Sequence, residues 1–393
     1  MSEQKIDAII VGGGIAGMWA LNVLKRCGYS TVLIETGTLG MDQTFASQGM
    51  IHGGLKYALS GQINTASEAI SDMPQRWRSC LATKSSVSPK TLKHAGNVDL
   101  DGCALLSNRY YMFAAGNTLG RLTTFFASKA LHGRIEKLSK PNWPGGFKGF
   151  KGTVYALNDF VIDTPKLLAH LAANHANSIF RCEANRSTVT RHPDGGYILK
   201  LKDTVLHTTQ LISCAGNGSA PLIDALNIPT LKVQHRPLKQ VLVKPKHNTA
   251  MYAHCLTHIK GPEPRLTITT HQADGHSLWY IGGQLATAGV TRSDAAQVDF
   301  AKAELETCLP WLDWQDADFS VLTINRAEPD QQLSVKPDTA YVERIDDFIQ
   351  CFPTKLTLTP DMADRLLRVL SPPEHKLSLN TSHPRATIGS PPW

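Results

Sequence analysis

The feature that most constrains this chain is a glycine-rich turn between two apolar stretches, within residues 5–35. One apolar run ends at Gly12, a segment of helical character follows, and a second apolar run stops at Glu35. Strand, glycine turn, helix, strand and acid in this order are typical of a dinucleotide-binding unit. Gly12 permits the tight turn, Gly14 lets the backbone approach a pyrophosphate, and Gly17 lets the helix pack closely on the sheet. A bare glycine turn also occurs in ordinary strand–helix connections, but both strands and the acid at this spacing favour the nucleotide.

The acidic residue at the end of the second strand selects among dinucleotides. A carboxylate at Glu35 accepts hydrogen bonds from the adenosine ribose hydroxyls and repels a 2′-phosphate. The helix after the turn presents unpaired N–H groups and the positive end of its dipole to the pyrophosphate. The sequence therefore favours FAD or NAD over NADP.

Length and charge limit the classes of protein that this chain can be. Its 393 residues are enough to bury a large core and to form two packed domains. Forty basic and thirty-three acidic residues leave a formal charge of +7. The basic residues are dispersed, so we expect no nucleic-acid groove, while an anionic substrate or a peripheral membrane contact stays open. No apolar run approaches the roughly 18 to 20 residues that cross a bilayer.

The eight cysteines form neither a CxxC pair nor a close cluster with histidines. We therefore predict no metal site and no disulfide framework, and the thiols are typical of a reducing compartment. No basic and apolar leader segment precedes the first strand. Together these patterns predict a cytoplasmic location.

A second unusual stretch, TFASQGMIHGGLKY, covers residues 44–57. Small hydroxyl residues and three glycines surround a single histidine there. Such a segment presents its backbone more than its side chains to a neighbour. Because a phosphate-binding turn precedes it, we expect this neighbour to be the remainder of the cofactor.

The glycine turn, Glu35 and residues 44–57 together resemble the FAD-dependent D-amino-acid oxidase and glycine oxidase superfamily, which includes sarcosine oxidase and glycerol-3-phosphate dehydrogenase. The piece IHGGLKY is particularly similar to a segment of the glycerol-3-phosphate dehydrogenases. The resemblance implies an α/β fold, α+β overall, with a Rossmann-like FAD-binding domain and an inserted, mostly antiparallel substrate-binding cap domain. The predicted FAD-binding domain comprises 1–83, 153–230 and 330–371, the cap 84–152 and 231–329, and a C-terminal tail or docking strap 372–393.

The resemblance also implies contacts with FAD along most of the chain. They fall on the glycine turn and its acid, on the segment after residue 44, near residue 185, on a strand that ends in Ala-Gly, and on the turn before the last predicted helix. The residues are Gly12, Gly14, Ile15, Ala16, Gly17, Glu35, Thr36, Thr44, Ser47, Gln48, Gly49, His52, Gly53, Asn185, Ala215, Gly216, Thr354, Lys355, Leu356 and Thr357.

Three interpretations of His52 are open. It is a neutral histidine fixed by hydrogen bonds near the cofactor, which we favour, or a catalytic or substrate-binding residue suited to proton transfer. In the third interpretation it attaches the flavin covalently, as a histidine in this region does in some members of the superfamily. We keep His52 as a candidate catalytic residue.

Two basic residues in the C-terminal third are candidates for the substrate end of the site. Arg326 ends a predicted strand, 321–326, and family members that oxidise amino or hydroxy acids place an arginine near this position to bind the carboxylate. The alternative is a surface arginine paired with Glu328 or Asp330. Family members usually have glycines where this chain has residues 353–355, and Lys355 either stabilises negative charge on the flavin or is a solvated loop lysine.

We expect an FAD-dependent oxidoreductase that oxidises a C–N or C–O bond of a small anionic molecule by hydride transfer to flavin N5. Amino acids, secondary amines and hydroxy acids are the candidate substrates. One alternative is an NAD-dependent dehydrogenase, which leaves the segment around His52 and the turn at 348–360 unexplained. Another is a flavin-bearing binding or assembly protein with a vestigial redox site. The patterns do not specify the oligomeric state.

Overall fold

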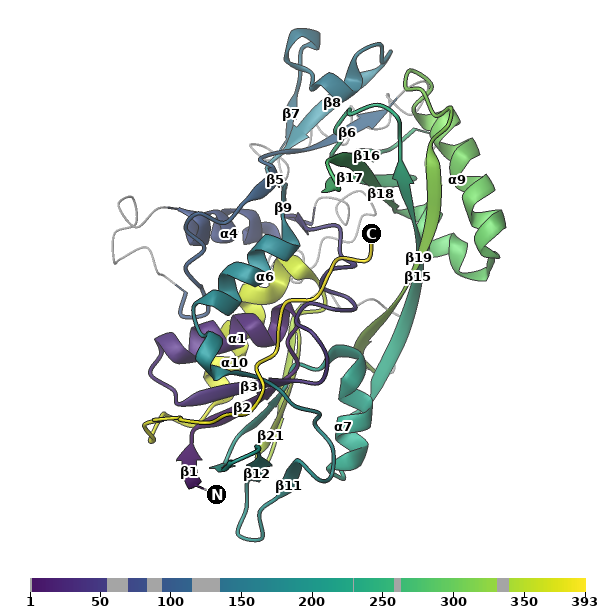
Figure 1. Cartoon of the computed structure of the whole chain (residues 1–393). Helices are drawn as coiled ribbons and strands as arrows, with labels where there is room; N and C mark the ends of the chain where they lie inside the picture. The colour runs from purple at the N-terminus through teal and green to yellow at the C-terminus, as the bar shows by residue number, and fades with distance from the viewer. Residues whose placement is uncertain are drawn as a thin grey trace.

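A six-stranded sheet gathers strands from both ends and the middle of the chain (Figure 1). The structure, a computed structural model, describes residues 2–54, 70–82, 94–114, 135–228, 230–257, 263–330 and 339–393. The strands, in spatial order, are β10 (Ile179–Arg181), β3 (Thr31–Glu35), β2 (Ala8–Val11), β14 (Leu211–Ser213), β21 (Phe348–Phe352) and β20 (Tyr341–Ile345). All are parallel except β20. The strand order reverses at β2, and the carboxyl ends of β2 and β14 therefore form the kind of crevice in which open α/β sheets bind ligands.

The six-stranded sheet is covered on both faces, which explains why its strands are almost wholly apolar. Helices α1 (Ile15–Arg26), α6 (Thr164–Ala173) and α10 (Thr359–Val369) share one core with alternate strand residues such as Ile10 and Leu33. Ile9 and Val32 point the other way, toward a smaller sheet. That sheet contains, in order, β1 (Ser2–Ile6), β13 (Thr204–Thr208), β12 (Tyr197–Lys200) and β11 (Val189–Arg191).

A second large sheet of eight strands forms the other end of the molecule (Figure 1), and we call it the cap sheet. In order it contains β19 (Asp318–Pro329), β15 (Val233–Lys244), β18 (His276–Gly282), β17 (Leu266–Ala273), β16 (Ala253–Cys255), β6 (Tyr110–Ala114), β8 (Thr153–Leu157) and β7 (Ile135–Lys137). Every neighbouring pair is antiparallel except β16 with β6.

The cap sheet has one face packed and one face turned toward the six-stranded sheet. Helix α9 (Asp294–Cys308) packs on the first face, where Val241, Trp279 and Ile281 share a core with its residues Ala301 and Leu305. The paired strands β15 and β19 extend from the cap toward α7 (Ser219–Ala225) (Figure 1). These long strands connect the two halves of the protein.

The remaining elements join the two large sheets. A three-stranded sheet of β4 (Met50–Ile51), β9 (Phe160–Ile162) and β5 (Leu105–Ser107) lies between them (Figure 1). Helices α4 (Met73–Leu81) and α8 (Gln284–Ala288) complete the regular α-helical structure of the described ranges. Within those ranges no helix is both long and apolar enough to span a membrane.

The expected fold class is confirmed in outline, with one difference at a candidate residue. The predicted hairpin at 187–202 forms as the antiparallel pair β11 and β12. The predicted strand 321–326 does not end at Arg326, because β19 pairs with β15 as far as Pro329. Part of the helix expected at 65–81, residues 65–69, lies outside the described residues.

Candidate functional site

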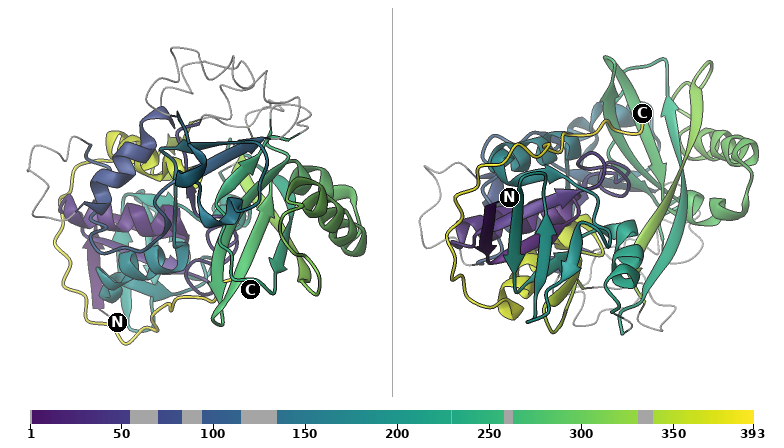
Figure 2. Two further views of the ribbon diagram at one scale, coloured as in Figure 1. Left: turned by 90° about the horizontal axis from the view of Figure 1, so that it is seen from above. Right: turned by 60° about the horizontal axis from the view of Figure 1, so that its bottom comes forward.

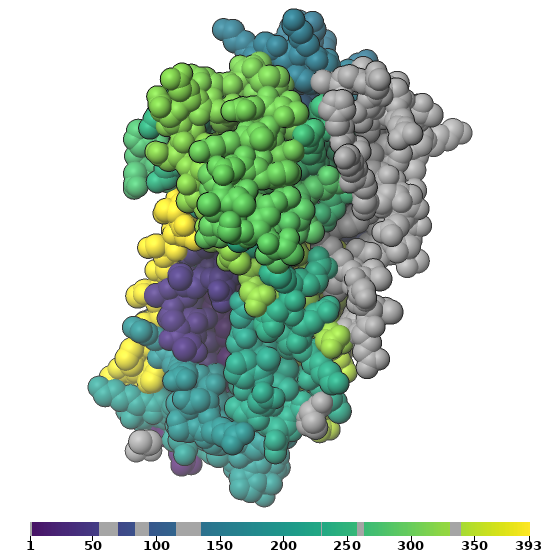
Figure 3. Space-filling view, turned by 90° about the vertical axis from the view of Figure 1, so that its right-hand side faces the viewer, coloured from purple at the N-terminus to yellow at the C-terminus, as the bar shows by residue number. Residues whose placement is uncertain are grey.

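A cavity of about 630 Å³ lies at the carboxyl ends of β2 and β14 and extends to the cap sheet. Its lining includes the turn after β2, the segment 40–50 and residues 353–356, together with Gln240 and Thr267 of the cap. Figure 3 shows the N-terminal part of the chain, in purple, at the surface between the cap, in green, and the teal region below it. The cavity thus lies where the two large sheets approach one another.

The turn after β2 requires glycine at two positions. Gly12 has a φ of +108°, and a Cβ there would lie 2.5 Å from the carbonyl oxygen of Cys214 at the end of β14. A Cβ on Gly17 would lie only 1.9 Å from the carbonyl oxygen of Gly12. Because both contacts involve backbone, a side chain at Gly12 would separate the turn from the end of β14, and one at Gly17 would separate α1 from the turn. The close packing expected for Gly17 from the sequence is present.

The acid at the end of β3 is tied to the glycine turn. Glu35 accepts a hydrogen bond from the backbone N–H of Gly13 at 2.6 Å through Oε2, and one from Gly37 at 2.9 Å through Oε1. The N–H of Ile15, in the first turn of α1, donates to Oγ1 of Thr44 at 3.0 Å. These contacts fix the acid, the helix N-terminus and the next segment against each other, and each carboxylate oxygen keeps a second acceptor site.

Gln48 links the segment 44–53 to the cap sheet. Its Nε2 donates to the carbonyl oxygens of Thr267, at 3.1 Å, and of Tyr280, at 3.0 Å. Gly282 lies beside it, where a Cβ would be 2.9 Å from Oε1 of Gln48. The side chain of Gln48 is therefore part of the joint between the two halves, and it also lines the cavity.

His52 is buried and its backbone is fixed on both sides by one threonine. Its N–H donates to Oγ1 of Thr357 at 3.3 Å, and the same hydroxyl donates to the carbonyl oxygen of His52 at 3.1 Å. Its ring atom Nδ1 accepts from the N–H of Gly54 at 3.2 Å. A neutral imidazole whose Nδ1 accepts a hydrogen bond carries its proton on Nε2. This arrangement favours a neutral, hydrogen-bonded histidine over a general base.

Arg326 and Lys355 both line the cavity. Nε of the half-buried Arg326 donates to the carbonyl oxygen of Arg236, its direct partner on β15, at 3.5 Å. The buried Glu328 forms an ion pair with Arg236 at 3.3 Å. Of the two carboxylates that the sequence suggested as partners for Arg326, Glu328 is therefore engaged by a different arginine.

The turn before Lys355 contains a strained residue. Thr354 has a φ of +59°, in the left-handed region that glycine adopts easily and a β-branched residue rarely does. Its hydroxyl donates to the carbonyl oxygen of Thr339 at 2.9 Å. Such strain costs about 1–3 kcal/mol and concentrates at functional sites. The glycines usual in the family are absent here, but the backbone still adopts a glycine-like conformation at Thr354.

Most of the residues singled out from the sequence line this one cavity. They are Gly12, Gly14, Ile15, Ala16, Glu35, Thr36, Thr44, Ser47, Gln48, Gly49, His52, Ala215, Gly216, Arg326, Thr354, Lys355 and Leu356. The four that do not are Gly17, Gly53, Asn185 and Thr357. Gly53 donates to the carboxylate of Asp159, and Asn185 accepts from the N–H of Ser187 in a local turn. Near Asn185 it is Glu183 and Ala184 that line the cavity.

Several lining residues were not identified from the sequence. Gln240, Thr267 and Gly282 come from three neighbouring cap strands. Successive side chains of each strand point to opposite faces of the sheet, and the sequence pattern shows this alternation. The pattern does not tell which of the two faces meets the other domain. Oε1 of Gln240 is buried without a hydrogen-bond partner, so the cavity wall contains an unsatisfied polar group.

The lining fits an extended dinucleotide. The turn after β2 and the end of β14 approach each other without side chains between them, as a pyrophosphate site requires. Acceptors on Glu35 and an unsatisfied amide on Gln240 belong to the same cavity. Among the described residues no group of three histidine, cysteine or acidic side chains is placed to hold a metal ion.

Comparisons with known proteins agree with this geometry. A family model described as FAD dependent oxidoreductase matches residues 7–330. A probable FAD-dependent oxidoreductase of Pseudomonas aeruginosa is 40% identical over 396 residues, which cover 98% of this chain and 97% of the relative. The crystal structure of an FAD-dependent oxidoreductase from Pseudomonas aeruginosa superimposes with a TM-score of 0.81 at 34% identity and covers 100% of this chain and 98% of that one.

A more distant structure shares the fold. L-α-glycerophosphate oxidase from Mycoplasma pneumoniae, solved with FAD bound, superimposes with a TM-score of 0.62 at 16% identity. The superposition covers 93% of this chain and 95% of that one. The resemblance stated from the sequence is confirmed, and of the two cofactors that Glu35 allowed, the family match selects FAD.

Proposed function

The chain belongs to the FAD-dependent oxidoreductase family, and from this premise we propose that it oxidises a C–N or C–O bond of a small anionic substrate. Amino acids, secondary amines and hydroxy acids have the required chemistry. The observation that supports the proposal is the single cavity that joins the glycine turn and Glu35 to Arg326 and Lys355 beneath the cap sheet. A site with these parts can hold a cofactor and a negatively charged molecule together.

Bound FAD supplies the acceptor for the hydride that leaves the substrate carbon, by transfer to flavin N5. The residues of the chain bind and orient. The N–H groups at the start of α1 bind the pyrophosphate, and the free acceptor sites of Glu35 bind the adenosine ribose. Gln48 connects the segment beside the cofactor to the cap, so that the cap keeps a fixed position over the cavity.

Arg326 and Lys355, the two basic residues among the described residues that line the cavity, give the site its preference for anions. The guanidinium of Arg326 presents paired N–H donors that match a carboxylate. Lys355 follows the strained Thr354 and adds a second positive charge, which stabilises negative charge that develops on the cofactor during reduction. With the substrate oriented and the charge balanced, the protein needs no dedicated acid–base pair.

His52 contributes a hydrogen bond in this proposal. Because Nδ1 accepts from Gly54, the neutral ring is a donor at Nε2. A donor suits a carbonyl oxygen of the cofactor or an oxygen of the substrate. This assigns His52 to orientation and leaves covalent attachment as the alternative that mass spectrometry of the denatured protein would reveal.

Anaerobic mixing of the purified yellow protein with single candidate substrates tests the reaction. We expect an amino acid, secondary amine or hydroxy acid to bleach the absorbance of the oxidised flavin. Amines that lack a carboxylate and simple alcohols are the matched controls, and they should bleach it much more slowly. Protein that binds FAD but is bleached equally by the charged and the uncharged series would contradict the anionic substrate.

The role of Arg326 can be tested once a substrate is found. Loss of two hydrogen bonds from a charged group, each worth about 1.5–3 kcal/mol, predicts that Arg326→Ala raises KM at least about 100-fold with little change in FAD affinity. Arg109→Ala is the control, because Arg109 forms an exposed ion pair with Glu136 away from the cavity lining. An unchanged KM in Arg326→Ala would assign the arginine to structure alone.

The proposal includes a cytoplasmic location. All eight cysteines have free thiols, and six of them are buried. Burial raises the pKa of the Cys351 thiol, next to the cavity, and keeps it protonated. Free thiols of this kind are typical of proteins in a reducing compartment. Fractionation of the native cells would check the location.

A further inference from the structure

Residues 371–393 form an extended strap that runs across both halves of the protein. Figures 1 and 2 show it in yellow, passing along the smaller sheets and ending beside the cap. From residue 374 to residue 383 exposed and partly buried residues alternate strictly. Leu377 and Leu379 pack into the core beneath the six-stranded sheet. The strap is thus a docked part of the fold rather than a loose tail.

Specific hydrogen bonds fix the lower part of the strap. The N–H groups of Glu374 and His375 both donate to Oδ1 of the buried Asp7, at 2.8 and 2.9 Å. Ser382 donates its N–H to Asp203 at 2.8 Å. The strap then runs beside the edge strand β10, where the N–H of Arg181 donates to the carbonyl oxygen of Pro384 at 2.9 Å.

The strap next touches the loop that lines the cavity. The N–H of Leu39 donates to the carbonyl oxygen of Thr387 at 2.8 Å, and the N–H of Gly389 donates back to Leu39 at 2.9 Å. A Cβ on Gly389 would lie 2.6 Å from Oγ1 of Thr38. Thr38 and its neighbours at 40–44 are lining residues. The strap therefore supports one wall of the cavity from behind.

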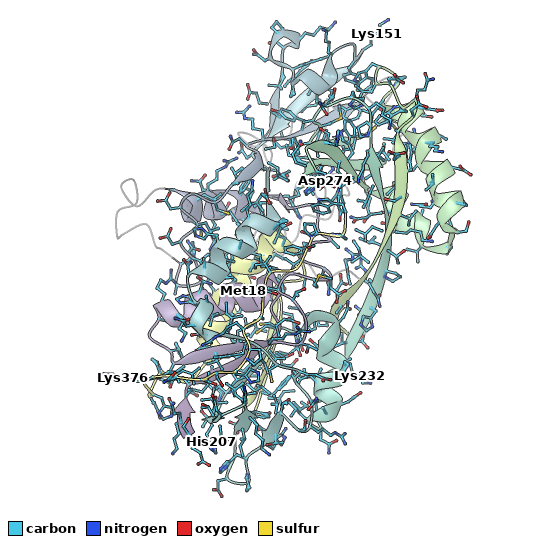
Figure 4. All side chains as sticks on the ribbon, viewed as in Figure 1. Met18, Lys151, His207, Lys232, Asp274 and Lys376 are labelled. Carbon is cyan, nitrogen blue, oxygen red and sulfur yellow. The ribbon has the colours of Figure 1, made fainter. Side chains whose placement is uncertain are left out.

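Trp393 places its indole against the cap sheet. Its ring lies 5.1 Å from the ring of His271 and 5.5 Å from that of Tyr280, measured between centroids. Both partners lie in the β17–β18 hairpin, whose turn at Asp274 is labelled in Figure 4. Leu278 of the same hairpin belongs to this small cluster.

These contacts are on the cap face that bears the cavity. Trp279 and Ile281 pack against α9, so Tyr280 and Gly282, which alternate with them, face the other way. Gly282 lines the cavity, and it is only two residues from Tyr280. The indole therefore covers the part of this face that lies directly beyond the cavity wall.

Beneath the indole is a polar group without a partner. Oη of Tyr280 is completely buried and has no hydrogen bond. Leaving such a group unsatisfied destabilises the fold, and a native structure with one needs a reason. The hydroxyl would find a partner if a ligand entered the space that Trp393 occupies.

We propose that Trp393 determines substrate size, by filling the space beside Tyr280 and His271 on the cap face next to the cavity, where a polar subsite would otherwise open. This inference rests on the proposed function, because it takes the substrate to lie between the flavin and the cap sheet. The indole limits the site to small molecules. Without it, the subsite accepts a longer substrate whose distal end offers a hydrogen-bond acceptor to Tyr280.

The test compares Trp393→Ala and Trp393→Phe with Thr381→Ala, which alters the strap at its contact with Asp203, far from the cap. Iodide quenching of the bound flavin's fluorescence needs no substrate. We expect a larger quenching constant in Trp393→Ala than in the other two variants. Added indole should restore the value of the unsubstituted protein by filling the vacated space. Equal quenching in all three variants, with FAD still bound, would overturn the proposal.

A series of unbranched 2-amino and 2-hydroxy acids, starting from glycine and glycolate, tests substrate size. In Trp393→Ala we expect KM to fall roughly tenfold for the longest acids and to stay unchanged for the shortest, since a better fit in a pocket is worth about 1–3 kcal/mol per group. A uniform change in KM, or a lower thermal stability alone, would show that Trp393 only holds the cap. If no acid bleaches the flavin in any variant, the proposed function fails, while the quenching result still stands by itself.

Discussion

Replacing Gly17 by alanine tests whether the close approach of α1 to the turn holds the nucleotide site together. In an ordinary helix this change stabilises by about 0.8–1.0 kcal/mol, because alanine is the better helix former. Here the new Cβ would lie 1.9 Å from the carbonyl oxygen of Gly12, and real Cβ atoms stay beyond 3.0 Å. The backbone must therefore separate by at least 1.1 Å, the difference between the two distances.

This displacement affects stability and cofactor binding differently. Overpacking of this kind costs about 1–3 kcal/mol or more, which outweighs the gain in helix propensity. The N–H groups at the start of α1 move with the helix, which lengthens their hydrogen bonds to the pyrophosphate. Loss of two charge-assisted hydrogen bonds, each worth about 1.5–3 kcal/mol, raises Kd roughly 100-fold or more. We therefore expect Gly17→Ala to lower the stability of the protein without FAD by about 1–2 kcal/mol and to raise the Kd for FAD roughly 100-fold.

Fluorescence titration of the apoprotein with FAD and thermal unfolding without FAD measure the two effects. Gly145→Ala is the matched control, since a Cβ at Gly145 meets no atom within 4 Å and its backbone is not in the left-handed region. We expect the control to change neither quantity beyond about 0.5 kcal/mol. If Gly17→Ala bound FAD as tightly as the control, the argument from the close contact would be refuted.

Two further predictions concern stability. Arg76 is buried and donates to Asp364 at 2.7 Å. Arg76→Met should cost about 3–5 kcal/mol in urea unfolding, because it leaves the mostly buried carboxylate of Asp364 without its arginine. Arg109→Met, which breaks an exposed ion pair, is the control and should cost under about 1 kcal/mol; equal losses in the two variants would show that the buried pair has no special weight. Burial lowers the pKa of His271 from 6.5 to about 4. Above pH 6.5 the ring is neutral in both the folded and the unfolded chain, and below it the unfolded chain takes up a proton that the folded chain does not. The protein should therefore lose up to about 3 kcal/mol of stability as the pH falls from 6.5 toward 4. Unfolding of His271→Gln followed from pH 7 to pH 4 should therefore show a shallower loss of stability than His276→Gln, which changes an exposed residue of the same hairpin; parallel curves would exclude His271 as the source.

Local patterns in the sequence were sufficient for the nucleotide end of the site. Gly17 and Glu35 could be singled out because their partners, Gly12 and Gly13, lie within one βαβ unit, where chain connectivity dictates the geometry. The cofactor contact of Gln48 was predicted from the family resemblance, and Gln48 lines the cavity. The fold class with its inserted cap was implied by the family resemblance, and the order of apolar runs and the strand-like alternation in the cap agreed with it.

The tertiary structure alone decided which face of the cap sheet meets the other half of the protein. Alternation along β15 and β18 puts Gln240 and Tyr280 on the opposite face of the sheet from the residues next to them in the chain. It does not say which of the two faces meets the six-stranded sheet, because that depends on how the two sheets pack. The partner of Glu328 is Arg236 and not Arg326, since register between β15 and β19 sets the pairing.

The strap, residues 371–393, shows most clearly what the sequence alone could not determine. Its prolines and polar residues indicated only a tail or a strap, because an extended segment has no periodicity that names its partners. The structure places its Trp393 against the cap, about as far along the chain from Glu35 as a residue can be. The sequence by itself determined the local strand–turn–helix unit at the start of the chain. The substrate end depends on contacts between residues that are hundreds of positions apart, such as Trp393 with His271.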